Sequence, residues 1–122
     1  MNADGFHDRP FDEGTLTKLQ IFQLYVREWL PVFLSRPEPQ WKEIHLFDFF
    51  AGPGTDSEGV PGSPLRLLEE LRTAQKQPGW GKVRVEAHFF DEDAAKIDAL
   101  RAKACSATDF LDSRVSVFTP PA

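Results

Sequence analysis

The segment IHLFDFFAGPG at residues 44–54 decides the fold class of this chain. Residues 44–50 form a nearly continuous apolar run, which is typical of a strand buried on both faces of a parallel sheet. Glycines follow at once in residues 51–54, where backbone can approach a ligand that side chains would exclude. We therefore expect a buried strand that runs directly into a glycine-rich, ligand-binding loop.

The sequence after this loop alternates between helical and strand patterns. Ser63 is the expected N-cap of an amphipathic helix, and residues 83–90 have the composition of a second strand. Asp93 is the expected cap of a second amphipathic helix, and residues 115–118 form a short third strand candidate. This alternation predicts an α/β fold, a Rossmann-like partial parallel sheet of βαβαβ type.

A helix is expected before the first strand. Residues 1–14 are a polar lead-in, and from residue 15 apolar residues recur at helical spacing, with Thr15 or Thr17 as the N-cap. The opposite side of this helix is apolar as well, and its residues are Ile21, Leu24, Tyr25, Trp29 and Val32. We therefore expect the helix to be covered on two sides, by further protein or by a second copy of the chain.

Composition narrows the function classes. The 122 residues carry a formal net charge of −5, which does not support binding of nucleic acid through phosphate contacts. A single cysteine, Cys105, excludes a disulfide scaffold, and the Cys/His spacings of structural zinc sites are absent. His45 and His88 each lie in a strand and are interpreted as core or edge residues, so no metal ligand is assigned. Neither a signal peptide nor a membrane span is indicated, and a cytoplasmic location is the default.

The ligand class is inferred from the loop and from Asp91, which ends the second strand. A carboxylate at that place accepts hydrogen bonds from the hydroxyls of a ribose. The loop lacks the complete G-x-G-x-x-G pattern and the lysine of a P-loop, and it contains Asp56 and Glu58, which would repel a diphosphate. A ribose-bearing, phosphate-free ligand with a positive centre fits better, and S-adenosylmethionine has these properties.

Three segments of the chain resemble a known family. Residues 48–54, Gly59 and the Gly-Ser-Pro-Leu at 62–65 are similar to the Asp-x-Phe-Ala-Gly-Pro-Gly…Gly-Ser-Pro signature of the three-Cys-motif partner proteins. The Lys…Tyr…Trp-Leu-Pro pattern of residues 18–31 resembles the helix before that family's first strand, and the Phe-Asp-Glu-Asp at 90–93 resembles the acidic end of its second strand. The resemblance implies the fold of class I S-adenosylmethionine-dependent methyltransferases and a companion protein with a three-cysteine motif.

The resemblance also implies roles for individual residues. Asp48 would hold the ammonium group of the cofactor, the loop would contact its methionine part, and Asp91 would bind its ribose. Bonding of loop amides by Asp48 and capping of the next helix by Asp91 are the structural alternatives. The residues expected to contact the cofactor are Asp48, Phe50, Ala51, Gly52, Pro53, Gly54 and Asp91.

The chain ends after the third strand candidate, before the place where the catalytic motif of such a methyltransferase would follow. We therefore expect residues 15–122 to be the N-terminal half of a methyltransferase-like domain, an incomplete fragment that is inactive alone, with unknown catalytic residues. The alternative is a non-catalytic partner or scaffold module that docks a companion protein or self-associates through the leading helix. A more distant alternative is a relative of cytosine-5 DNA methyltransferases, whose opening motif is similar but whose catalytic Pro-Cys is absent.

Overall fold

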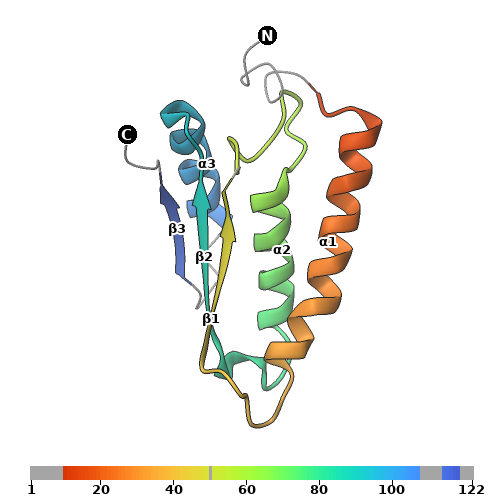
Figure 1. The fold of residues 1–122 in the computed structure, drawn as a ribbon, viewed down its shortest axis with the longest axis vertical. Helices are drawn as coiled ribbons and strands as arrows, with labels where there is room; N and C mark the ends of the chain where they lie inside the picture. The colour runs from red at the N-terminus through yellow and green to blue at the C-terminus, as the bar shows by residue number, and fades with distance from the viewer. Residues whose placement is uncertain (1–9, 50, 108–113, 119–122) are drawn as a thin grey trace.

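The computed structural model describes residues 10–49, 51–107 and 114–118, and it has the α/β architecture expected from the sequence. Figure 1 shows the helices and strands in chain order. Their bounds are α1 Glu13–Leu34, β1 Glu43–Asp48, α2 Ser63–Gln75, the short 3-10 helix η2 Trp80–Lys82, β2 Arg84–Phe90, α3 Ala94–Ala107 and β3 Arg114–Phe118.

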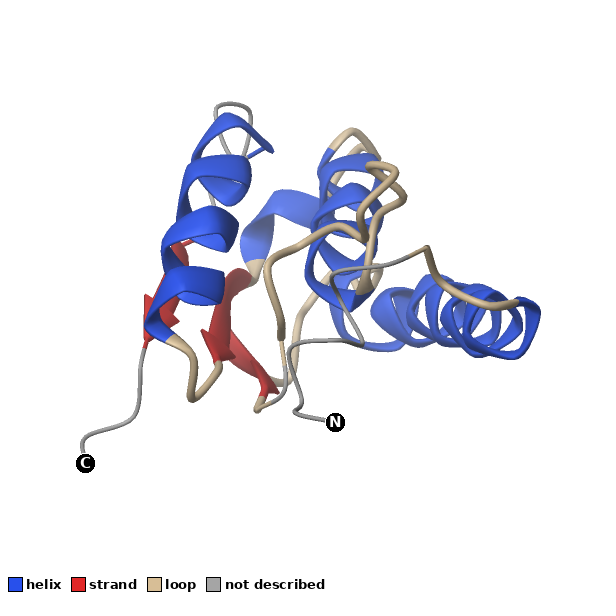
Figure 2. Cartoon of the chain, turned by 90° about the horizontal axis from the view of Figure 1, so that it is seen from above, coloured by secondary structure: helices blue, strands red, loops and turns tan. Residues whose placement is uncertain are grey.

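The three strands form one parallel sheet in the order β1-β2-β3. The predicted parallel sheet with alternating helices is therefore confirmed. Helices α2 and α3 lie on the same side of the sheet, and α1 packs beside α2 (Figure 2). Because all strands run in one direction, their carboxyl ends meet at one edge, where the loop after β1 and the start of α3 also lie (Figure 1).

The hydrophobic core lies between the sheet and these helices. Val85, Ala87 and Phe89 alternate along β2 and are buried on this side, as the period of two in a strand requires. The helices add fully buried leucines to the same cluster, namely Leu30 from α1, Leu68 and Leu71 from α2 and Leu100 from α3. One continuous core therefore joins all three helices to the sheet.

The other face of the sheet differs from the prediction. Residues 44–50 are expected to be buried on both sides, but Phe47 is 56% exposed and Phe49 is 61% exposed. The reason is that the helices of the described chain all lie on the opposite side of the sheet (Figure 2). Across β1, side chains that face the helices alternate with exposed ones, so this strand is half-buried.

Helix α1 begins earlier than predicted, and Asp12 caps it in place of Thr15 or Thr17. The Asp12 carboxylate accepts a hydrogen bond from the Thr15 N–H at 2.7 Å, which satisfies one of the unpaired donors of the first turn. The Thr17 hydroxyl instead donates to the Glu13 carbonyl within the helix. The expected lead-in is therefore shorter by two residues. Its Phe11 is buried, and residues 1–9 lie outside the described residues.

Only one side of α1 is covered within the described chain. Val26, Leu30 and Leu34 are buried against the core. On the other side, four large apolar residues are exposed: Ile21, Leu24, Tyr25 and Val32. The expected second covering layer is therefore not found among the residues that the structure describes. No helix in those parts of the chain is both long and apolar enough to cross a membrane.

A buried carboxylate fastens α1 to α2. Glu70 accepts two hydrogen bonds from the Arg27 guanidinium, at 2.9 and 3.0 Å, and one from the Gln23 amide at 2.8 Å. The Arg27 hydrogen bonds hold the pKa of Glu70 below its usual value, against the opposing effect of burial. The fork geometry of arginine, which matches both carboxylate oxygens, thus sets the position of α1 along α2.

Candidate cofactor site

The glycine-rich loop leaves β1 at the carboxyl edge of the sheet. The Ala51 N–H donates to the Phe90 carbonyl at 2.9 Å, so the chain stays bonded to β2 beyond the end of β1. It then turns at Gly52 and Gly54, whose φ angles of 71° and 99° disfavour residues with a side chain. The loop is therefore where the sequence predicts it, and the expected contact residue Phe50 lies outside the described residues.

Asp91 and the loop are directly bonded to each other. One Asp91 carboxylate oxygen accepts from the Gly52 N–H at 3.0 Å, and the other accepts from the Asp93 N–H at 2.9 Å. The side chain is partly buried at the end of β2. Because an ionised carboxylate has about four lone-pair sites, these two bonds leave acceptor capacity for a further ligand.

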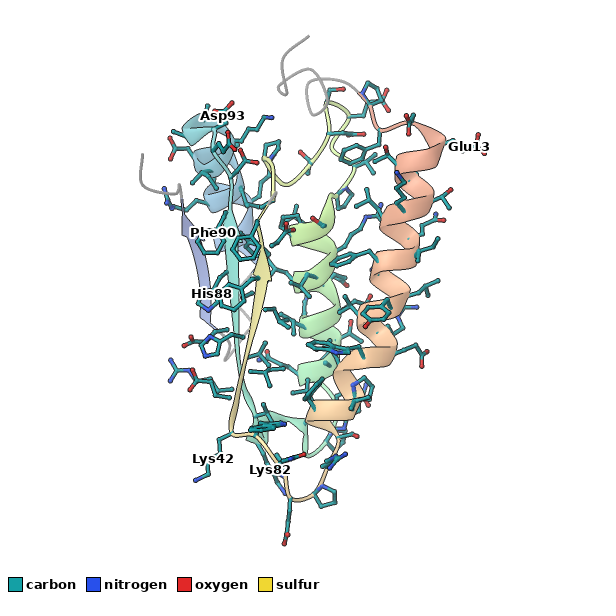
Figure 3. The ribbon with its side chains drawn as sticks, in the orientation of Figure 1. Glu13, Lys42, Lys82, His88, Phe90 and Asp93 are labelled. Carbon is teal, nitrogen blue, oxygen red and sulfur yellow. The ribbon has the colours of Figure 1, made fainter. Side chains whose placement is uncertain are left out.

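The neighbouring Asp93 caps α3, as the sequence predicts. Its carboxylate accepts from the backbone N–H groups of Ala95 and Lys96. Figure 3 labels this residue at the start of the helix. Asp93 and not Asp91 therefore caps α3. Asp91 instead accepts hydrogen bonds from the loop and from the turn before the helix.

Asp48 faces the helix side of β1 and holds the start of α2. Its carboxylate accepts a hydrogen bond from the Ser63 hydroxyl at 2.6 Å. The prediction that Ser63 is the N-cap of this helix is wrong, because Gly62 occupies that position and Ser63 is already helical. The Gly62 N–H donates to the Gly54 carbonyl at 2.8 Å, so both ends of the loop are joined.

Asp56 is a structural residue of the loop. Its buried carboxylate accepts hydrogen bonds at 2.9 Å from the backbone N–H groups of Phe11, Glu58 and Val60. Burial by itself raises the pKa of Asp56, but these backbone hydrogen bonds outweigh that effect and keep the net pKa below its usual value. Its negative charge is therefore directed at loop amides and at the segment before α1.

Lys103 of α3 contacts the loop, which the sequence did not predict. From α3, its ammonium group donates to the Pro53 carbonyl at 3.0 Å and to the Thr55 hydroxyl at 2.8 Å. These partners are 50 and 48 residues away in the chain, so no local pattern could indicate the contact. A positive charge therefore lies beside a loop that appears only acidic in the sequence.

One hollow among the described residues lies away from the loop and Asp91. A cavity of about 240 Å³ lies between α1 and α2, with Arg27, Glu70 and Trp80 among its lining residues. It does not include the loop or Asp91.

No family model, curated protein or solved structure matches the chain.

Proposed function

We propose that this chain binds S-adenosylmethionine as a Rossmann-like, methyltransferase-like domain of the three-Cys-motif partner kind. The observation that carries the proposal is the 3.0 Å hydrogen bond between the Gly52 N–H and the Asp91 carboxylate. It joins the glycine loop after β1 to the acidic residue that ends β2. These two features are the ones that together bind a nucleoside in a doubly wound sheet.

The topology supports this proposal. A strand order of β1-β2-β3, with α2 and α3 on one face, is that of one half of a doubly wound sheet. In such sheets, ligands bind outside the carboxyl ends of the strands. The loop at residues 51–62 and Asp91 both lie at that edge of the present sheet.

The charges of the site suit a cofactor with an amino-acid end. Asp91 would accept the ribose hydroxyls, and Asp48 would attract the ammonium group of the methionine part. Lys103 beside the loop is compatible with this arrangement, because the methionine part also carries a carboxylate. Since Asp56 is directed at backbone amides, the proposal rests on Asp48 and Asp91 and not on the total acidity of the loop.

We expect Asp91→Ala to weaken the binding of S-adenosylhomocysteine, the demethylated product, by about 1.5–3 kcal/mol. The reason is that a charged acceptor of two ribose hydroxyls is lost. Isothermal titration calorimetry on the 122-residue chain measures this change. Asp98→Ala is the matched control, because Asp98 is an exposed carboxylate on α3 that pairs only at the surface with Arg101, and its loss should leave the affinity unchanged.

Asp91→Asn separates the loop-holding role from the cofactor role. An asparagine can still accept from the Gly52 N–H, so the thermal unfolding temperature should change less than in Asp91→Ala. Its neutral amide should nevertheless bind the ribose more weakly than the carboxylate does. A wild-type chain that unfolds cooperatively but shows no heat of binding with S-adenosylmethionine or S-adenosylhomocysteine would refute the proposal.

A second candidate function is that of a non-catalytic module that self-associates. The observation that favours it is the row of exposed apolar residues on α1, which are Ile21, Leu24, Tyr25 and Val32. Their spacing of three, four and seven places them on one helical face, which a second copy could cover in an antiparallel pair. Sedimentation velocity of wild type against Leu24→Glu tests this candidate. We expect a dimer that the substitution dissociates, and a monomeric wild type contradicts it.

A further inference from the structure

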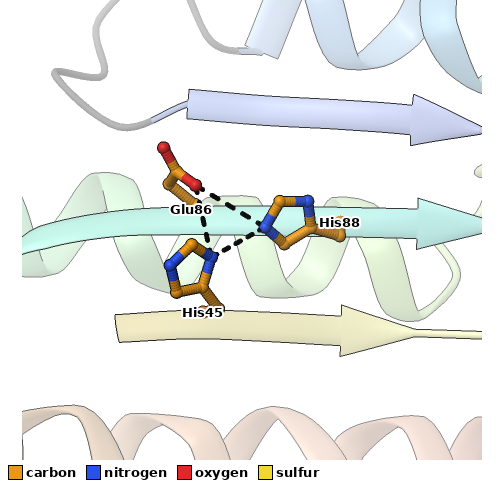
Figure 4. A group of neighbouring side chains, drawn as sticks. All are labelled: His45, Glu86 and His88. Carbon is orange, nitrogen blue, oxygen red and sulfur yellow. Dashed lines mark hydrogen bonds and ion pairs between the residues drawn. The ribbon is translucent and has the colours of Figure 1, made fainter. Parts of the chain in front are cut away.

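Strand pairing gathers two histidines and a glutamate on the exposed face of the sheet. Glu86 and His88 are two residues apart on β2, so their side chains project from the same face. The parallel register pairs His45 of β1 with Glu86, which brings the second histidine to that face. Figure 4 shows the three side chains converging across the two strands.

The ligand atoms of these side chains are spaced as around a metal ion. His45 Nδ1 lies 3.0 Å from His88 Nε2 and 3.2 Å from a Glu86 carboxylate oxygen, and that oxygen lies 3.7 Å from His88 Nε2. In a tetrahedral zinc site, with ligand bonds of about 2.0–2.2 Å, neighbouring ligand atoms are about 3.3–3.6 Å apart. The observed triangle brackets this range.

Glu43 orients the ring of His45. Its carboxylate lies 2.7 Å from His45 Nε2, and we assign a proton to this nitrogen because a carboxylate can only accept. In the tautomer with this one proton, Nδ1 carries none and faces the carboxylate oxygen of Glu86. Two such acceptor atoms 3.2 Å apart repel each other unless a proton or a cation lies between them. With a metal ion bound at Nδ1, Glu43 and His45 would form the carboxylate–histidine–metal arrangement that orients histidine ligands in metal sites.

Other neighbours orient the remaining ligands. Arg84 lies 3.2 Å from the second carboxylate oxygen of Glu86, which leaves the first oxygen directed at the histidines. The ring of Phe47 stacks on that of His88 with centroids 4.8 Å apart, and this contact restricts rotation of the imidazole. His88 and Phe90 are two residues apart on β2, so their side chains lie on the same face of the sheet (Figure 3).

The cluster is accessible from solvent. The side chains of Glu86 and His88 are 14% and 16% exposed, and that of His45 is 39% exposed. A bound ion would therefore have three protein ligands and one position open to water, which is the ligand count of catalytic and not of structural zinc sites. The group is also separate from Asp91 and the glycine loop, because its members lie on the sheet face and not at the carboxyl edge.

We propose that His45, Glu86 and His88 bind a divalent first-row transition-metal ion of the Zn²⁺ class. Imidazole nitrogens favour such ions over Mg²⁺ and Ca²⁺, which prefer oxygen ligands. No metal ligand was expected from the sequence, because 43 residues separate His45 from His88 and only the strand register brings them together. The proposal is independent of S-adenosylmethionine binding.

Zinc titration of the metal-free chain tests the site. We expect one equivalent of Zn²⁺ to bind in isothermal titration calorimetry and an excess of Mg²⁺ not to compete. His45→Ala, His88→Ala and Glu86→Gln should each weaken binding by more than about 100-fold, whereas Glu43→Gln, which removes only the orienting partner, should cost about 10- to 100-fold. The controls are His7→Ala and Cys105→Ser, which remove the remaining histidine and the only cysteine and should not change the affinity.

A measurement on the wild type keeps the test independent of variant folding. The chain has three histidines, so its imidazole signals in a nuclear magnetic resonance spectrum can be assigned with the His7→Ala variant. On addition of Zn²⁺, we expect the rings of His45 and His88 to shift and that of His7 to stay. The proposal is overturned if the wild type binds no zinc, or if zinc shifts the His7 ring and leaves the other two in place.

Discussion

Phe89→Ala should lower the free energy of unfolding by about 3–5 kcal/mol, the range typical of a buried phenylalanine truncated to alanine. Phe89 is 0% exposed near the carboxyl end of β2 and belongs to the core cluster that joins the sheet to all three helices. The substitution removes apolar surface from the core and leaves a cavity that the close-packed residues of this cluster cannot fill without strain.

Urea denaturation followed by circular dichroism measures this loss, and Phe47→Ala is its matched control. Phe47 lies on the adjacent strand and has the same side chain, but it is 56% exposed on the open face, so its truncation should cost less than about 1 kcal/mol. If Phe89→Ala does not fold, Phe89→Leu should still show a measurable loss of about 1–2 kcal/mol. Equal costs at Phe47 and Phe89 would show that the two faces of the sheet are assigned wrongly.

Gly54→Ala should lower the free energy of unfolding by about 2–4 kcal/mol, from two effects that add. The φ of Gly54 is +99°, a region that residues with a Cβ atom rarely adopt. In addition, an added Cβ would lie 3.2 Å from the side chains of both Leu100 and Lys103. Because Leu100 is fully buried, its side chain has no space to move into, and the close contact would push the loop away from α3.

Gly79→Ala separates these two effects. Gly79 has a similar φ of +82°, but nothing lies within 4 Å of the position that a Cβ would occupy. It should therefore show only the backbone cost of about 1–2 kcal/mol. Thermal and urea unfolding of both variants give the comparison. A Gly54→Ala variant no less stable than Gly79→Ala would mean that α3 does not press against the loop as the structure shows.

Local patterns in the sequence were sufficient to predict much of the fold. The period of two in residues 83–90, the helical spacing after Asp93 and the glycines after residue 50 each reflect neighbours close in the chain. The types and order of these elements, their parallel arrangement and the place of the loop are as predicted. The loop and Asp91 could be expected to meet because parallel strands end at one edge.

Several contacts of the candidate site could not be predicted in this way. Serine is a residue type that often caps helices, but the Ser63 hydroxyl donates a hydrogen bond to Asp48 across the strand–helix junction. Lys103 reaches Pro53 across 50 residues of sequence. In each case, the partner is chosen by the packing of α2 and α3 on the sheet. Polar side chains have several possible partners, and only the folded arrangement decides between them.

The sequence by itself determined the kinds of elements, their order and the glycine loop, because hydrophobic period and backbone freedom are properties of neighbouring residues. Only the tertiary structure decided which face of β1 is covered, since the same apolar run suits a strand buried on one side or on both. It also decided that His45, Glu86 and His88 meet. A shift of the register by one residue would turn His45 to the opposite face of the sheet, so this cluster is a product of strand pairing alone.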